Sequence, residues 1–65
     1  MRNKKGITAN ERLNRDIEFA ATVKNAEQRY SLLKMALATA EFAVDFGLIT
    51  YNEWKDHINK AFALM

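Results

Sequence analysis

Few side chains in this sequence could perform acid–base or nucleophilic chemistry, and they are not grouped. His57 is the single histidine and Ser31 the single serine of the 65 residues. No glycine-rich turn exposes Ser31 as a nucleophile, and the two residues lie on different predicted helices. Glu53 and His57 are one helical turn apart, but two ligands without a third do not form a metal site. We therefore expect a non-enzymatic protein with no catalytic residues, no metal and no cofactor.

The length and composition point instead to a binding protein. A chain of 65 residues forms one domain and buries only about 60% of the surface that it exposes when unfolded. Domains this small are commonly supported by disulfides, a metal or a second subunit. The sequence has no cysteine, which excludes disulfides and thiolate metal sites. Self-association or a protein partner is the support that remains.

The charges suggest a second class of function, in which the chain binds nucleic acid. The net charge is +2, and residues 1–7 read as a flexible basic tail ahead of a single helical domain. The rest of the chain is close to neutral, and the acidic Glu53 and Asp56 lie on the C-terminal helix that would have to enter a groove. Nucleic acid is therefore possible as a partner but not favoured. The residues available for such a contact, or for a protein contact, are Arg2, Lys4, Lys5, Arg12 and Arg15.

The first predicted helix begins with a capping box. Thr8 and Glu11 have the spacing in which each side chain satisfies a free backbone N–H group of the other. Apolar residues then recur at alternating intervals of four and three, which is a heptad pattern. Because no glycine or proline interrupts it, we predict one helix over about 9–46. The alternative is a break near Asn25, because Asn25 and Gln28 also have capping spacing.

The heptad positions form the predicted contact between subunits, and a second apolar stripe follows the later half of the helix. Two helices cannot enclose both stripes, so the surplus should be covered by another subunit or a partner. The predicted oligomer interface is Phe19, Val23, Ala26, Tyr30, Leu33, Leu37, Ala40 and Val44. The second stripe is Leu32, Met35, Ala36, Thr39, Phe42, Ala43 and Phe46.

The C-terminal joint has the most specific local signals. Gly47 stands where a helix C-terminus favours a left-handed residue, with Leu48 folding back on the last turn. Thr50 and Glu53 form a second capping box, which starts a helix over about 51–64. The residues expected to hold this helix against the first one are Phe42, Phe46, Ile49, Trp54, Ile58 and Phe62.

This joint resembles that of the short C-terminal oligomerisation domains of bacterial and phage proteins. The shared residues are Phe46-Gly47-Leu48-Ile49-Thr50 followed by Glu53 and Trp54, within the last third of the chain. The last five residues, Ala61 to Met65, differ from the lysine- and leucine-rich end of those domains. The resemblance implies self-association.

Together these patterns predict an all-α helical hairpin with a long N-terminal and a short C-terminal helix, assembled as a homo-oligomeric helical bundle. We expect a cytoplasmic location, because no apolar run approaches the roughly 18 residues that span a bilayer. The functional hypothesis is a protein-binding protein, similar in size to phage or mobile-element accessory proteins that inhibit or recruit a host protein. The alternatives are a nucleic-acid-binding regulator that uses the basic tail or the C-terminal helix, and a purely structural oligomerisation module.

Overall fold

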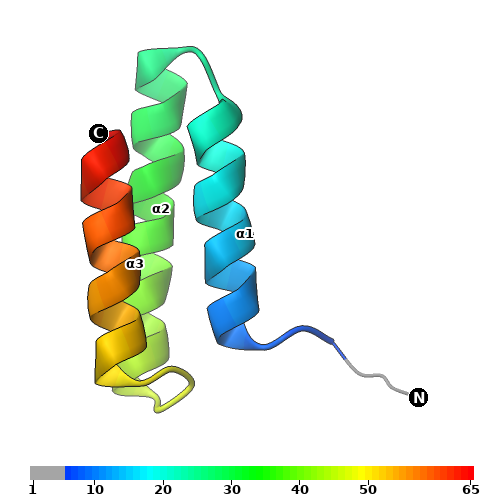
Figure 1. Cartoon of the computed structure of the whole chain (residues 1–65), viewed down its shortest axis with the longest axis vertical. Helices are drawn as coiled ribbons and strands as arrows, with labels where there is room; N and C mark the ends of the chain where they lie inside the picture. The colour runs from blue at the N-terminus through cyan, green and yellow to red at the C-terminus, as the bar shows by residue number, and fades with distance from the viewer. Residues whose placement is uncertain (1–5) are drawn as a thin grey trace.

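The computed structural model describes residues 6–65, and within this range it contains three α-helices and no strand (Figure 1). The helices are α1 (Ala9–Thr22), α2 (Ala26–Asp45) and α3 (Tyr51–Leu64). The helices α1 and α3 run in one direction along two sides of α2, which runs in the opposite direction. Each helix contacts the other two. The molecule is flat, with Cα extents of 37, 25 and 14 Å.

The all-α class is confirmed, but the prediction of a single helix over 9–46 is wrong. The chain leaves the helical conformation at Val23 (φ −81°, ψ 121°) and re-enters it after Asn25 (φ −72°, ψ 119°). The Asn25 side chain accepts a hydrogen bond of 2.9 Å from the Gln28 N–H group, as the alternative interpretation expected. All of these dihedral angles are open to ordinary residues, so the chain reverses here without glycine or proline.

Both predicted capping boxes are confirmed. Thr8 Oγ1 accepts a hydrogen bond of 3.1 Å from the Glu11 N–H group, and the Glu11 carboxylate accepts one of 2.9 Å from the Thr8 N–H group. Thr50 and Glu53 make the same reciprocal pair at 3.1 and 2.8 Å. These bonds satisfy backbone donors that lack partners inside the helix, and they fix the starts of α1 and α3.

The predicted helix end at Gly47 is also confirmed, and it belongs to α2. Gly47 adopts a positive φ of 74°. The Leu48 N–H group donates to the Ala43 carbonyl at 2.8 Å, and the Gly47 N–H group donates to the Val44 carbonyl at 3.1 Å. These two bonds define a Schellman motif, which needs a residue that tolerates the left-handed region.

The core between the three helices is built mainly from small side chains. One buried cluster contains Ile17, Ala20, Leu33, Ala36 and Ala61, and the other contains Leu13, Ala40, Ala43 and Ile49. Alanine is thus the commonest buried residue, and only four buried hydrophobic side chains of the described residues are larger. Small side chains allow the helices to approach closely, but each alanine buries little apolar surface.

None of the described helices combines the length and the apolar character that a membrane crossing requires.

Candidate functional site

Large hydrophobic side chains are more numerous on the surface of this molecule than in its core. Ten of them in the described residues have exposed fractions from 44% to 67%. A single exposed apolar residue is ordinary, but a cluster of them on a small protein needs an explanation. The ten residues are Ile7, Phe19, Tyr30, Met35, Phe42, Phe46, Leu48, Tyr51, Phe62 and Met65.

Several of these residues lie along one stripe of α2. Met35, Phe42 and Phe46 are separated by seven and four residues, so their side chains leave the helix in nearly the same direction. The rings of Phe42 and Phe46 contact each other, with centroids 4.5 Å apart. Their exposed fractions are 60% and 67%. The two rings therefore form a continuous aromatic surface at the C-terminal end of α2.

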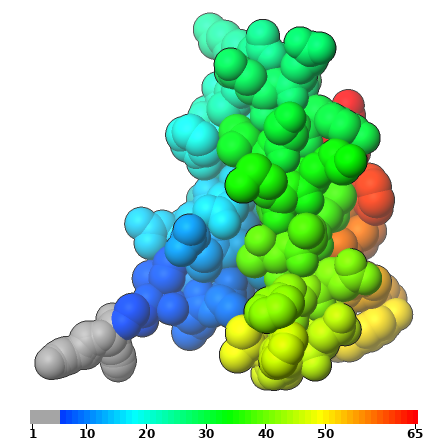
Figure 2. Space-filling view, turned by 180° about the vertical axis from the view of Figure 1, so that it is seen from behind, coloured from blue at the N-terminus to red at the C-terminus, as the bar shows by residue number. Residues whose placement is uncertain are grey.

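Phe19 of α1 extends this stripe across a groove between two helices. Two neighbouring hollows between α1 and α2 are both lined by Phe19 and Leu32, and Met35 lines one of them. Seen from behind, α2 lies in front, with α1 along one side and α3 along the other (Figure 2). We call this exposed side of α2, together with Phe19 of α1, the outer face. Its residues are Phe19, Lys34, Met35, Ala38, Glu41, Phe42 and Phe46.

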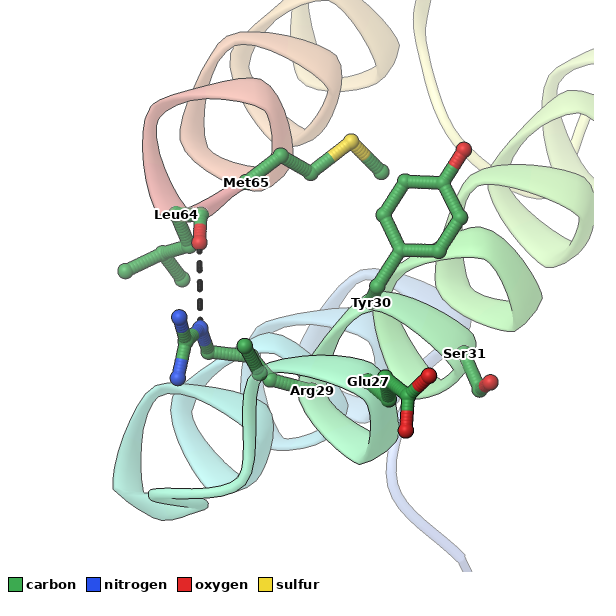
Figure 3. A pocket seen from close by; sticks show the side chains of 7 residues that line it. Glu27, Arg29, Tyr30, Ser31, Leu64 and Met65 are labelled. Carbon is green, nitrogen blue, oxygen red and sulfur yellow. Dashed lines mark hydrogen bonds between the residues drawn. The ribbon is translucent and has the colours of Figure 1, made fainter.

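The opposite edge of α2 carries another hollow, beside α3. Tyr30 and Met65 line it from the two helices, and both side chains are about half exposed (Figure 3). Lys34 lies over the Tyr30 ring, with Nζ 5.6 Å from the centroid. Phe62 and Tyr51 are exposed on α3. Apolar surface therefore borders α2 on both sides.

Arg29 closes the end of this hollow and connects three segments of the chain. Its Nε donates to the Leu64 carbonyl at 3.2 Å (Figure 3). A terminal guanidinium nitrogen donates to the Val23 carbonyl at 3.0 Å. Both carbonyls lie at helix C-termini, where a positive charge is favourable. Sequence reasoning missed this role, because it depends on α1 ending at Thr22 and on α3 lying next to the start of α2.

The structure places the predicted oligomer interface in two different environments. Leu33 and Ala40 are buried inside the chain, while Leu37 and Val44 are half-buried against the clusters that include α3. The third helix thus covers the middle of the heptad pattern within one molecule. The remaining positions are half-buried or exposed: Val23, Phe19, Ala26 and Tyr30.

The predicted hairpin contacts are also divided. Ile49 is buried, and Trp54 and Ile58 pack against its cluster, as expected for the hydrophobic staple at the start of α3. The three phenylalanines, Phe42, Phe46 and Phe62, are instead exposed. These three side chains therefore contribute little buried surface to the contact between α2 and α3.

The predicted charged contacts lie beside the outer face or outside the described range. Arg12 forms an ion pair with Asp16, with Nε and Oδ1 3.4 Å apart. Arg12 and Arg15 line a hollow that Phe19 also borders. The tail positions Arg2, Lys4 and Lys5 lie outside the described residues.

His57 is a buried residue of α3. Only 1% of the residue is exposed, and its Nε2 lies 2.6 Å from Asn10 Oδ1 on α1. Because an amide oxygen only accepts, Nε2 carries the proton in this contact. Nδ1 is buried without a hydrogen-bond partner. Burial lowers the pKa of His57, Lys60 lowers it further, and Asp56 and Glu53 act in the opposite direction.

The surroundings of His57 are those of a buried side chain paired with an amide. Its hydrogen-bond partner is Asn10 of α1. No group of three or more potential metal ligands is found in residues 6–65. The exposed apolar surface around α2 is therefore the strongest candidate for a functional site.

Comparison with known proteins provides no relative from which a function could be transferred. No protein-family profile, curated protein or solved structure matches the chain.

Proposed function

We propose that this chain is a small non-enzymatic protein that binds other protein surfaces, and that it acts as an oligomer through the outer face of α2. The observation that carries the proposal is the distribution of side chain size. Met35 and Phe42 of α2 and Phe46 at its C-cap are large and exposed, while the buried side of the same helix carries Ala36, Ala40 and Ala43.

The exposed apolar residues of the outer face are of the types found at protein interfaces. Aromatic residues and methionine are enriched where proteins bind one another, and contiguous apolar surface on a small protein marks such sites. The outer face offers Phe19, Met35, Phe42 and Phe46 within one continuous region. Its groove between α1 and α2 also gives a partner side chain a concave surface to enter.

The size of the core supports assembly for a separate reason. Residues 6–65 hold four buried hydrophobic residues larger than alanine, which give little apolar burial to offset the conformational entropy of so small a domain. Covering the outer face would remove more apolar surface from water, and each Å² of apolar surface buried stabilises the assembly by about 25 cal/mol. Binding and stability are thus expected to be coupled.

Single substitutions to aspartate test the proposed surface. Met35→Asp and Phe42→Asp introduce a charge into the outer face, and both positions are exposed, so the helices should still form. Ala63→Asp is the matched control, because Ala63 is exposed in a hollow that only α1 and α3 line. Mass from light scattering should fall for the two outer variants and stay at the wild-type value for the control. Equal masses for all four proteins, with circular dichroism showing intact helices, would contradict the proposal.

A further inference from the structure

The exposed side of α2 carries one positive and one negative residue, placed so that two antiparallel copies of the helix would set opposite charges against each other. Lys34, Ala38 and Glu41 are spaced by four and three residues and are all exposed, so they share one side of the helix. Lys34 and Glu41 are two turns apart, roughly 10 Å along the axis, which is too far for an ion pair within the helix. Neither residue belongs to an ion pair within the described part of the chain.

We infer that the partner on the outer face is a second copy of this chain, packed with its α2 antiparallel to the first about a two-fold axis near Ala38. This inference rests on the proposed function and specifies the occupant of the same surface. The axis sets Lys34 of each copy opposite Glu41 of the other, which gives two equivalent ion pairs. In a parallel arrangement in register, Lys34 would face Lys34 and Glu41 would face Glu41.

The apolar residues follow the same symmetry. Met35 and Phe42 are also seven residues apart and also centred near Ala38, so the antiparallel pairing sets Met35 of each copy opposite Phe42 of the other. Phe19 lies beside Leu32 and Met35 at the N-terminal half of α2. The reversed helix brings its C-terminal half to this position, and with it the Phe42–Phe46 surface. Charged residues therefore meet opposite charges, and apolar residues meet apolar ones.

The dimensions of the face and the size of its central residue permit this contact. The broad face extends over 37 by 25 Å between Cα atoms, and a standard interface covers roughly 800 Å² on each partner. Ala38 lies at the centre of the exposed side, opposite Ala36 and Ala40. A methyl side chain at the crossing point allows the two helices to approach within about 8 Å of each other.

Disulfide trapping tests the orientation directly, because the natural sequence has no cysteine to interfere. Lys34→Cys and Glu41→Cys variants are oxidised separately and then as an equal mixture, with Glu18→Cys as the control on the opposite side. A disulfide requires Cα atoms within about 7 Å. We expect the mixture to yield mainly the heterodimer in which one Lys34→Cys chain is linked to one Glu41→Cys chain. Each variant alone should yield little covalent dimer, and Glu18→Cys should yield little in any combination.

Charge reversal tests the pairing of Lys34 with Glu41 independently and needs no oxidation. Lys34→Glu or Glu41→Lys alone turns both intermolecular pairs repulsive, and the dimer dissociation constant should rise roughly tenfold or more. The double variant restores both pairs with reversed polarity and should return to within about threefold of the wild type. Equal weakening by the single and double variants would contradict the pairing.

The outcomes separate this inference from the proposed function. Covalent dimers of Lys34→Cys with itself would show a parallel contact, which overturns the antiparallel pairing but leaves the outer face as a binding surface. No trapping from a chain that is dimeric by mass would overturn the antiparallel pairing. If the masses of Met35→Asp and Phe42→Asp also stayed at the wild-type value, another surface would assemble the chain, which overturns both. A monomeric wild-type chain would also overturn both.

Discussion

The two sides of α2 differ in the size of the apolar side chains that they carry. Its inner side contributes Leu33 and three alanines to the buried clusters, whereas its outer side carries Met35, Phe42 and Phe46 in solvent. A helix that served only to complete a core would have the opposite distribution, with its largest residues inside. The difference indicates that close helix packing sets the fold and that the larger apolar surface is available for another molecule.

This comparison predicts different consequences for substitutions on the two sides. Changes inside should lower the free energy of unfolding, while changes outside should alter assembly and leave the isolated fold nearly unchanged.

The largest effect is expected at Trp54, which packs against the cluster of Leu13 and Ile49. Trp54→Ala should lower the free energy of unfolding by about 3 to 5 kcal/mol, because it removes the largest side chain of the α3 contact. Trp54→Phe should cost less than about 1.5 kcal/mol, since it keeps most of the packing and removes a buried Nε1–H group that has no partner. Urea unfolding measures both changes. Equal stability of Trp54→Ala and the wild type would show that α3 does not depend on this side chain.

Arg29 should show the next largest effect, because its guanidinium connects the C-terminal ends of α1 and α3. Arg29→Met keeps the apolar stem but loses both charge-assisted hydrogen bonds, and we expect a loss of about 2 kcal/mol in urea unfolding. Lys24→Met is the control, because Lys24 is an exposed cation in the connection between α1 and α2. A similar result for both variants would mean that the two bonds contribute nothing to stability.

His57 should make the interior sensitive to acid. Its pKa is lowered from 6.5, chiefly by burial, so below about pH 6.5 the unfolded chain takes up a proton that the folded chain resists. The free energy of unfolding should therefore be highest above this pH and fall as the pH decreases below it. Melting temperatures of the wild type and His57→Gln across pH 5 to 8 check this. An identical pH dependence for the two proteins would rule out His57 as the cause.

The smallest effect on folding is expected on the outer face. Met35→Gln keeps a good helix former at a position that is 66% exposed. At protein concentrations where the wild type is monomeric, the free energy of unfolding should change by less than about 0.5 kcal/mol. A loss comparable to that of Trp54→Ala would show that Met35 belongs to the core and would remove the contrast between the two sides.

The sequence predicted the local features well, because their causes are local. The capping boxes at Thr8 and Thr50 and the left-handed Gly47 depend on residues within one turn of each other. The break at Val23–Asn25 was harder to predict. It uses extended dihedral angles that any residue adopts. The heptad positions on either side of it, Phe19, Ala26 and Tyr30, are exposed, so the spacing continued across the break without any shared core contact.

The candidate site was predicted only in part, because it depends on how the three helices pack and not on local spacing. The second stripe drew attention to Met35, Phe42 and Phe46, but spacing alone could not separate them from the buried Ala36 and Ala43 beside them. That separation depends on where α1 and α3 lie around α2. The burial of His57 was likewise indicated only by its position three residues after Trp54 and four before Ala61, both of which face the interior.

The central claim is that the outer face is covered by another protein surface, and the mass of the wild-type chain in solution tests it most directly. Size exclusion with light scattering at two protein concentrations should give a mass near twice that of one 7.5 kDa chain at the higher concentration. A mass of one chain at both concentrations would contradict self-association through this face.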